Sequence, residues 1–140
     1  MSRKIDTGTE QLLCSVDNHV ATVSFNRPEK RNALGEIVTP ALRQVLVALE
    51  ADSDVRVIIL TGVGKAFCAG GDVKKFAQAA AQGGMSMSFD DRVTDLRMRM
   101  DVSRILHEMP KPTLAVIPGP AAGAGLSMAL ACDMRIAASN

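Results

Sequence analysis

The stretch that most constrains the fold covers residues 118–133 and reads PGPAAGAGLSMALACD. An apolar run at residues 113–117 precedes it, and the small apolar residues from Gly123 onward continue for long enough to form a helix. The pattern predicts a buried strand, a tight turn and a helix start. Because Gly119, Gly123 and Gly125 have no side chain, a ligand could lie against free backbone N–H groups at the positive end of the helix. Close packing of the helix on the strand would require the same glycines, so this stretch alone supports both interpretations.

A second stretch upstream repeats the pattern. The β-branched run at residues 55–61 leads into GVGKAFCAGGD at residues 62–72, and a helix is expected from about residue 72 to residue 81. Turns that follow neighbouring parallel strands emerge at the same edge of a sheet, so one N–H from each can converge on a single oxygen. The two stretches together predict an oxyanion hole. A phosphate cradle fits less well, since Gly64 and Lys65 lack the glycine spacing and the following Ser or Thr of a P-loop.

The rest of the chain alternates strands and helices. Apolar periodicity predicts further strands over residues 12–16, 20–25 and 134–137, a helix over residues 36–52, and a helix from Ser88 to about Met109 with Met98 on its core face. Asp17, Asn18 and His19 predict a hairpin between the first two strands, and the spacing of Ser88 to Asp91 predicts a capping box. Polar residues around Pro28 predict a loop over residues 26–34. This alternation predicts an α/β unit with right-handed crossovers.

Composition argues against several classes of protein. The 140 residues have a net charge of +1 and four phenylalanines as their only aromatic residues, so nothing indicates a nucleic-acid partner. The widely spaced Cys14, Cys68 and Cys132 suggest neither a disulfide framework nor a metal motif. No apolar stretch reaches the ~18 residues of a membrane span, and residues 1–8 lack the apolar core of a signal peptide. We expect a soluble, cytoplasmic protein with no membrane partner.

Three motifs, in this order and spacing, resemble those of the enoyl-CoA hydratase/isomerase (crotonase) family. They are FNRPEKRNAL at residues 25–34, AFCAGGDV at residues 66–73, and PGPAAGAGL at residues 118–126, followed by ACD at residues 131–133. The resemblance spans essentially the whole chain. It implies an α/β, crotonase-like spiral of ββα repeats, with residues 1–140 as the N-terminal part of an acyl-CoA-binding domain. Family members are about twice as long, so the spiral is expected to be incomplete at its C-terminus.

The resemblance also implies a site. It assigns the two oxyanion donors to the backbone N–H groups of Gly71 and Ala124. The ligand would be an acyl-CoA substrate, with no separate cofactor and no metal. Its contacts would come from Lys30, Arg31, Ala33, Ala69, Asp72, Val73, Pro120, Gly123 and Ser127. Within this set, Lys30 and Arg31 belong to the loop that holds the CoA adenine and phosphates. Members of the family usually form trimers or pairs of trimers, so a homotrimer or hexamer is expected.

One position departs from the family pattern. In hydratases of this family, a catalytic glutamate stands four residues into the helix after the second glycine turn, where this chain has Ser127. A hydroxyl has no usable base strength near neutral pH, so it cannot replace a carboxylate as general acid–base. The second glutamate of the family lies beyond residue 140. We therefore expect isomerase-type or weak hydratase chemistry through a thioester enolate.

Two other functions stay open. One is a crotonase-like subunit that binds acyl-CoA, or only assembles with other subunits, without turnover, and both Ser127 and the short chain raise this possibility. An NAD(P)-dependent short-chain dehydrogenase matches the glycine spacing at residues 119–125. However, more than a hundred residues precede that turn, and the chain has no tyrosine for a Tyr-x-x-x-Lys pair. Calorimetry with acyl-CoA and with NAD(P), with turnover assayed in parallel, would separate these functions.

Several residues near the motifs have both a structural and a functional interpretation. Asp72 suits a helix cap better than a substrate-orienting role, and Asp133 suits a structural role at a helix end. Cys68 has the small-residue surroundings of a packed thiol rather than of a nucleophile. Met98 is expected to fill space in the core. Ser127 either packs within its helix or donates a hydrogen bond to the substrate.

Overall fold

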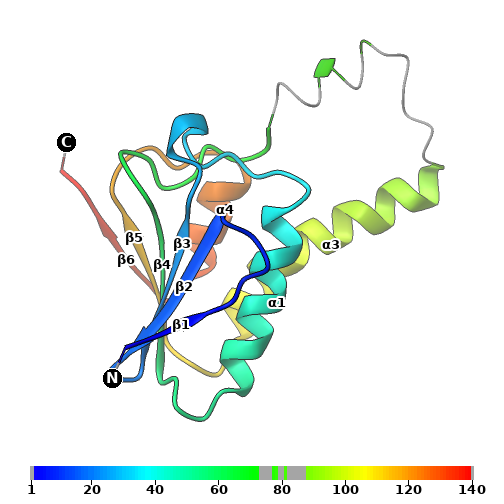
Figure 1. Ribbon diagram of the computed structural model, residues 1–140. Coiled ribbons are helices and arrows are strands. Elements are labelled where there is room, and N and C mark those ends of the chain that lie inside the picture. The colour runs from blue at the N-terminus through cyan, green and yellow to red at the C-terminus, as the bar shows by residue number, and fades with distance from the viewer. Residues whose placement is uncertain (1, 73–76, 79–80, 82–87, 140) are drawn as a thin grey trace.

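The computed structural model describes residues 2–72, 77–78, 81 and 88–139, and these form one mixed sheet with helices on one side (Figure 1). The strands are β1 (Arg3–Ile5), β2 (Leu12–Asp17), β3 (Val20–Phe25), β4 (Val57–Gly62), β5 (Thr113–Ile117) and β6 (Met134–Ala137). The helices are the 3₁₀ turn η1 (Pro28–Lys30) and the α-helices α1 (Val38–Ala51), α3 (Phe89–Glu108) and α4 (Ala124–Ala131). The helix predicted for residues 72–81 lies largely outside the described residues.

The described strands follow one another across the sheet in the order β1-β2-β3-β4-β5-β6. The first three pair antiparallel, and β3, β4, β5 and β6 pair parallel. The predicted hairpin between β2 and β3 is confirmed, and its turn residues Asn18 and His19 have φ of 46° and 68°. Because β4 and β5 pair parallel, the two glycine turns that follow them are neighbours at the carboxyl ends of these strands.

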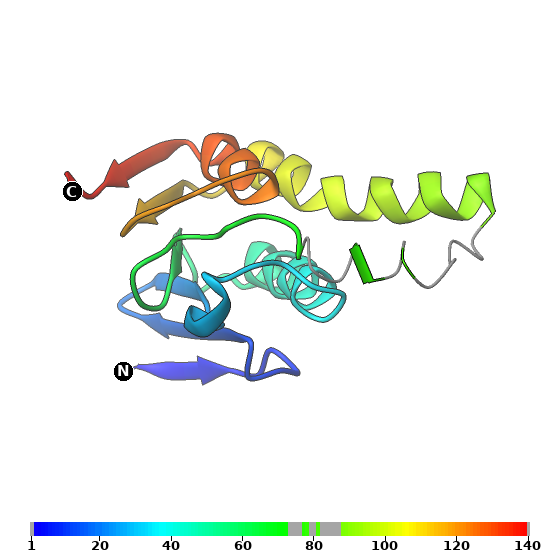
Figure 2. The same ribbon diagram turned by 90° about the horizontal axis from the view of Figure 1, so that it is seen from above.

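The core lies between the sheet and helices α1, α3 and α4, which all cover the same face (Figure 2). Alternate side chains of the strands point into it, including Cys14, Val23 and Ile58. Phe25 at the end of β3 contacts Phe67 of the first glycine turn edge to face, with ring centroids 5.7 Å apart at 85°. Such a pair contributes ~1 kcal/mol beyond its buried area and joins the turn to the sheet.

Helix α1 begins two residues later than predicted, at Val38, because the Gly35–Ile37 segment turns before the helix. Pro40 falls in its first turn, where a missing N–H costs nothing. At the other end, the Lys111 ammonium donates to the carbonyls of Leu49 (2.6 Å) and Asp52 (2.5 Å). These bonds satisfy carbonyls that the helix leaves without partners, and they fix α1 to the segment before β5.

The N-cap that the capping-box spacing predicted at Ser88 is confirmed, whereas the Asp91 carboxylate bonds the Ser88 hydroxyl and not its backbone N–H. The hydroxyl of Ser88 accepts from the Asp91 N–H at 3.1 Å and donates to the Asp91 carboxylate at 2.8 Å. The expected core position of Met98 is wrong, since its residue is 58% exposed. The first half of α3 extends past the rest of the molecule (Figures 1 and 2), and only its second half, from Val102 onward, reaches the core.

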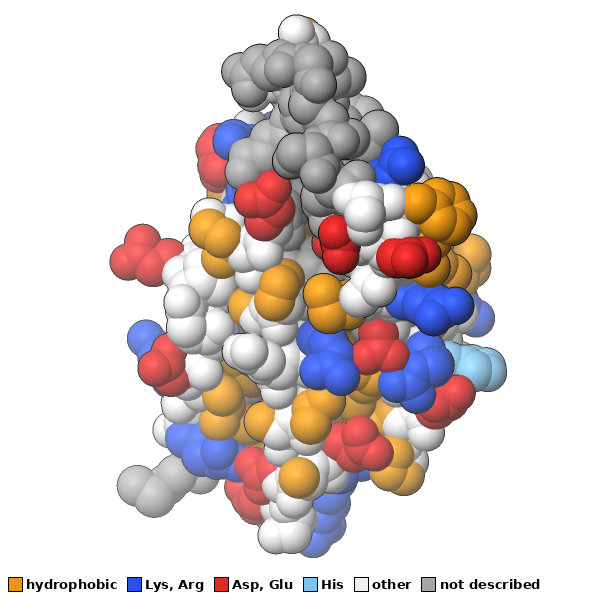
Figure 3. Space-filling model, turned by 90° about the vertical axis from the view of Figure 1, so that its right-hand side faces the viewer, with side chains coloured by type: hydrophobic (Ala, Val, Ile, Leu, Met, Phe, Trp, Pro, Cys, Tyr) orange, Lys and Arg blue, Asp and Glu red, His pale blue; other side chains and the backbone are white. Residues whose placement is uncertain are grey.

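Opposite charges alternate on the face that α1 and α3 form (Figure 3). Asp101 of α3 accepts from Arg43 of α1 at 2.7 Å and from Arg104 at 2.6 Å, and Arg104 also donates to Glu108 at 2.6 Å. Guanidinium hydrogen bonds lower the pKa of the Asp101 carboxyl. This exposed network links the two helices, and it mixes both signs instead of forming a basic surface.

Strand β1 is absent from the prediction. The strand is short, and its residues Arg3 to Ile5 are mostly polar, so the sequence shows no apolar alternation there. The strand forms because its backbone pairs with β2. Arg3 also forms ion pairs with Asp52 and Asp54 at the far end of α1. A strand of this kind depends on its neighbours and not on its own sequence.

The other face of the sheet is not covered by any described element. On it, Met134 and Ile136 of β6 pair with Leu114 and Val116 of β5, and they are 51% and 59% exposed. Leu13 of β2 is 46% exposed. Within the described residues, β6 is one of the two edge strands of the sheet, so it presents unpaired backbone groups beside apolar side chains.

We expect the 140-residue chain to self-associate through this face and to unfold with low cooperativity. Replacing both Met134 and Ile136 by lysine places charges there and should shift sedimentation velocity profiles toward the monomer. The matched control replaces Leu96 and Met100, exposed apolar residues of α3, by lysine, and should leave the association unchanged. A wild-type monomer with a sharp two-state melt would contradict this prediction.

Candidate active site

The first glycine turn, residues 62–72, is hydrogen-bonded along its length to the loop at residues 26–34. The Ala69 N–H donates to the Arg31 carbonyl at 3.0 Å, and the Leu34 N–H donates to the Gly70 carbonyl at 2.7 Å. The Asp72 N–H in turn donates to the Leu34 carbonyl at 3.0 Å. Two motifs that are distant in the sequence therefore form one small parallel ladder at the ends of β3 and β4.

Asn32 holds this ladder from inside, and the sequence reasoning did not single it out. Its side chain is buried, accepts from the Arg27 N–H at 2.8 Å, and donates to the carbonyls of Val63 (3.0 Å) and Ala66 (2.8 Å). A φ of 56° turns its backbone inward, a conformation that Asn adopts more readily than most residues. An asparagine in a polar loop gives no sign of burial, so only the three-dimensional contacts identify this role.

The two glycine turns are hydrogen-bonded to each other. The Phe67 N–H donates to the Pro120 carbonyl at 3.0 Å, and the Ala122 N–H donates to the Cys68 carbonyl at 3.0 Å. A Cβ at Gly125 would lie 2.4 Å from the Cys68 oxygen, and one at Gly119 would lie 2.0 Å from the Lys65 oxygen. These two glycines therefore serve close packing of backbone on backbone, which is one of the two interpretations of the stretch.

Gly123 has a different reason to be glycine. Its φ of 52° and ψ of −128° are strongly disfavoured for residues with a side chain, whereas a Cβ there would meet nothing closer than 3.8 Å. The conformation starts helix α4 and leaves the N–H of Ala124 in its first turn. A Cβ at Gly70 would lie 3.4 Å from the Ala124 nitrogen, so the residue before Gly71 lies against this helix start.

Two backbone N–H groups remain available where the turns meet. The ladder uses the Gly70 carbonyl and the Asp72 N–H but not the Gly71 N–H between them. Ala124 is the first residue of α4, whose N–H has no partner within the helix. Neither N–H donates to another described residue, and both residues are exposed. A ligand oxygen could accept from them without breaking any bond of the fold.

The other predicted site residues lie on the same two turns and on the adjoining loop. Lys30 and Arg31 are exposed on and just after η1, and Ala33, Ala69 and Asp72 are half-buried along the ladder. Pro120, Gly123 and Ser127 are exposed on the second turn and α4. The structure thus gathers these residues at one edge of the sheet. Val73 lies outside the described residues.

The polar side chains of this region have identifiable partners. The Arg27 guanidinium lies 3.6 Å from the Asp72 carboxylate and donates to the Ala33 carbonyl at 2.6 Å, with little of either ion-pair side chain exposed. Cys68 is fully buried, and burial raises the pKa of its thiol to about 11, as expected for a packed thiol. The cap predicted for Asp72 concerns a helix outside the described residues.

Ser127 is exposed on α4 and bonds within its own helix, as in the first of its two expected roles. Its residue is exposed, and its hydroxyl donates to the Gly123 carbonyl at 3.2 Å, four residues back along α4. The same carbonyl accepts from the Ser127 N–H at 3.0 Å. The Ser127 hydroxyl points toward the first turn of α4 because the Gly123 carbonyl there is a local hydrogen-bond acceptor.

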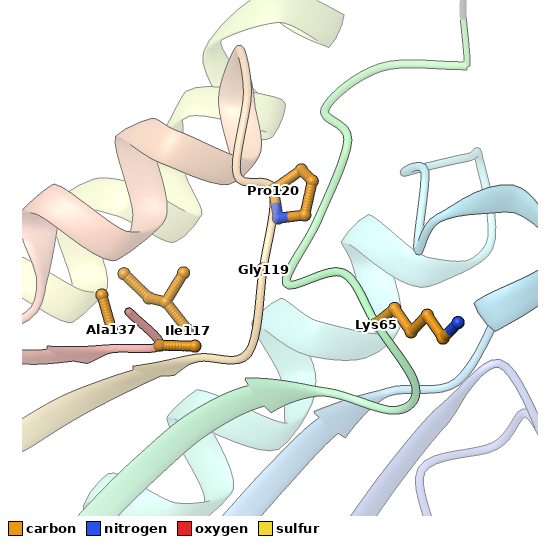
Figure 4. Close-up of a pocket in the computed structure, with 6 residues that line it drawn as sticks. Lys65, Ile117, Gly119, Pro120 and Ala137 are labelled. Atoms are coloured by element: carbon orange, nitrogen blue, oxygen red, sulfur yellow. The ribbon is translucent and has the colours of Figure 1, made fainter. Parts of the chain in front are cut away.

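A cavity of about 390 Å³ lies beside the second turn (Figure 4). It is lined by Lys65, Ile117, Gly119, Pro120, Ala137 and Ala138. Ile117 and Ala137 lie next to each other on β5 and β6, whereas the side chain of Lys65 points away from them. The cavity shares Pro120 with the predicted site but includes neither Gly71 nor Ala124.

Among the described residues, no cluster of three or more His, Cys, Asp or Glu is placed to hold a metal ion. The helices of the same described ranges include none with the length and apolar character of a membrane span.

The mixed sheet, with its helices on one face and two glycine turns meeting at neighbouring strand ends, defines a crotonase-fold α/β protein. The family model described as enoyl-CoA hydratase/isomerase matches residues 15–140, and the chain belongs to this family. The resemblance and the fold class inferred from the sequence are both confirmed.

Individual relatives agree with this assignment. The (E)-benzylidenesuccinyl-CoA hydratase of Thauera aromatica is 43% identical over 128 residues, which cover 89% of this chain and 46% of that protein. The solved enoyl-CoA hydratase/isomerase of Xanthobacter autotrophicus Py2 has a TM-score of 0.80 at 36% identity, over 91% of this chain and 46% of its own. The enoyl-CoA hydratase of Bacillus anthracis has a TM-score of 0.78 at 31% identity, over 91% and 47%. The chain spans about half the length of these relatives.

The end of α4 is held by a reciprocal contact between Asp133 and Thr113. The Asp133 carboxylate accepts from the Thr113 N–H (2.8 Å) and hydroxyl (3.0 Å), and the Asp133 N–H donates to that hydroxyl at 3.0 Å. The structural role expected for Asp133 is confirmed. The Thr113 backbone and side-chain hydrogen bonds lower the pKa of Asp133 below its usual 3.8.

Since the folded state lowers this pKa, the contact contributes fully above pH ~4 and its contribution is lost as the pH falls through the folded value. We expect Asp133→Asn to lower the melting temperature at pH 7 and to flatten its decline below pH ~4. Thermal melts by circular dichroism between pH 2 and pH 7 measure both effects. Asp17→Asn in the exposed hairpin is the control, and equal pH profiles for the two variants would contradict the prediction.

Proposed function

We propose that this chain binds the carbonyl of an acyl-CoA thioester between the N–H groups of Gly71 and Ala124 and stabilises the enolate formed from it. The observation that carries the proposal is that these two donors are unused while the peptides around them are fixed by hydrogen bonds. Donors held in place before the reaction need no reorganisation as charge develops on the oxygen. Each such donor stabilises the anion by ~3 kcal/mol, or about 10²-fold in rate.

The adjoining loop supports a CoA ligand. Lys30 and Arg31 provide two exposed cations on a loop whose backbone is hydrogen-bonded to the first turn. Phosphate groups are recognised by such cations. Three of the predicted contact residues, Ala33, Ala69 and Gly123, have small side chains or none, which suits a thin pantetheine chain. The relatives named above act on CoA thioesters by their names, which agrees with this substrate class.

We propose an isomerase-type or other enolate-based reaction, with weak hydration. In isomerisation a base removes a proton from carbon, and the C–H electron pair delocalises into the thioester carbonyl. Isomerisation returns one proton to another carbon, so one carboxylate can serve both steps. Hydration instead adds water at C3, so it requires one group that activates the water and another that delivers a proton to C2. Ser127 cannot take either role, and we assign no base among the described residues.

Ser127 also supports a second candidate, a subunit that binds acyl-CoA without turnover. Its hydroxyl occupies the position of a hydratase glutamate and is bonded to its own helix. For either function, we propose a cytoplasmic homotrimer or hexamer, as the family resemblance implies.

The Ala124 donor can be removed with little change to the fold. Ala124 is the first residue of α4, where proline is well tolerated, so Ala124→Pro deletes the N–H while the helix can still form. We expect a loss of about 10²-fold in kcat, or in affinity for an enolate-like analogue. Ala124→Ser retains the N–H and is the matched control. Wild-type activity or analogue affinity in the proline variant would rule out this donor.

The reaction type is tested by direct comparison of 2-enoyl-CoA and 3-enoyl-CoA as substrates. We expect turnover of 3-enoyl-CoA to exceed hydration of 2-enoyl-CoA, and Ser127→Glu to raise the hydration rate, because the variant restores a carboxylate at the hydratase position. Hydration by the wild type at an ordinary kcat of ~1–10³ s⁻¹, with no gain in Ser127→Glu, would show that the assignment is wrong. Calorimetric binding without any turnover would favour the non-catalytic subunit.

A further inference from the structure

The carbonyl of Gly123 and the N–H of Ala124 belong to the same peptide group. A peptide is planar and trans, so its C=O and N–H lie in one plane and point in opposite directions. Whatever fixes the direction of the Gly123 carbonyl therefore also fixes the direction of the Ala124 N–H. This carbonyl accepts two hydrogen bonds from one residue, from the Ser127 N–H at 3.0 Å and from the Ser127 hydroxyl at 3.2 Å.

The N–H of Gly71, the other proposed donor, is aligned in the same manner, but by a backbone hydrogen bond. The Gly70 carbonyl accepts from the Leu34 N–H at 2.7 Å, and the Gly71 N–H lies on the opposite side of that peptide. Here the anchor is backbone, which a substitution at Leu34 cannot remove. At the second donor, half of the anchor is a side-chain hydroxyl, and Ser127 alone provides it.

The hydrogen bond from the Ser127 hydroxyl to the Gly123 carbonyl is not needed to satisfy a buried polar group. Ser127 is exposed, so water could satisfy both its hydroxyl and the carbonyl. Serine that bonds four residues back along a helix stabilises the helix less than alanine would. A hydrogen bond to the carbonyl does, however, draw electron density from the peptide and strengthen its N–H as a donor, by about 10–30% per bond.

We propose that Ser127 is a positioning residue for the proposed oxyanion hole. Its hydroxyl holds the Gly123–Ala124 peptide in the orientation that aims the Ala124 N–H at the substrate oxygen, and strengthens that donor. The residue that replaces the hydratase glutamate thus supports the enolate through the backbone instead of moving a proton. This inference rests on the proposed function, because it concerns one of its two donors.

The hydrogen bond itself can be tested without substrate. In the full chain labelled with ¹³C and ¹⁵N, Ser127→Ala should move the Gly123 carbonyl carbon and the Ala124 amide proton upfield, since the carbonyl loses one of its two donors. Ser127→Thr retains the hydroxyl and should restore both resonances. Ser103→Ala makes the same change on α3 and is the matched control. Unchanged Gly123 and Ala124 resonances in Ser127→Ala would overturn the proposal.

The functional part compares two probes by calorimetry. Acetoacetyl-CoA forms an enolate readily, whereas butanoyl-CoA presents a neutral carbonyl. We expect Ser127→Ala to lower the affinity for acetoacetyl-CoA about fivefold and the affinity for butanoyl-CoA by less than about twofold. Ser127→Thr should recover the preference for acetoacetyl-CoA. If Ser127 had a purely structural role, Ser127→Ala would lower the affinity for both probes equally. If its hydroxyl bonded the substrate directly, the variant would also lose affinity for butanoyl-CoA.

The two proposals fail in different ways. Absence of binding of either probe to the wild type would overturn the proposed function, and the role of Ser127 with it. Binding by the wild type, together with an unchanged preference for acetoacetyl-CoA in Ser127→Ala, would overturn the role of Ser127 alone. Since alanine favours a helix more than serine does, Ser127→Ala is expected to fold, and a melt by circular dichroism verifies it.

Discussion

The backbone hydrogen bonds of residues 66–72 are the interaction on which the rest of the site depends. This turn bonds on one side to the loop at residues 26–34 and on the other side to the turn at residues 118–122. The contact with the second turn needs backbones at van der Waals distance, which Gly119 and Gly125 permit by carrying no Cβ. Three segments that are far apart in the sequence thereby become one rigid edge of the sheet.

The ladder explains why two N–H groups can stay unused at an exposed place. Their peptides are held through the opposite atoms, the carbonyls of Gly70 and Gly123, so the donors keep their direction without an acceptor of their own. Preorganisation of this kind separates the cost of orientation from the chemical step, because folding fixes the dipoles before a substrate arrives. Family membership and this geometry both support the proposed acyl-CoA chemistry, and the chain spans about half the length of its relatives.

Local patterns predicted much of this fold. The hairpin around Asn18 and His19, the strands β4, β5 and β6, and the Ser88 cap of α3 are all present, because turn chemistry, β-branched runs and capping spacing act over a few residues. Strand β1 and the exposure of Met98 were not predictable in this way. The first depends on pairing with β2, and the second depends on how far α3 extends past the core.

The sequence by itself determined the family, the strands from β2 to β6 and the presence of two glycine turns after neighbouring strands. Only the tertiary structure decided what each residue of those turns does. It assigned Gly119 and Gly125 to backbone packing, Asn32 to the interior of the ladder, and Ser127 to the Gly123 carbonyl. The physical reason is that a motif specifies residue types along the chain, whereas the partner of a hydrogen bond between distant segments exists only after the sheet has brought them together.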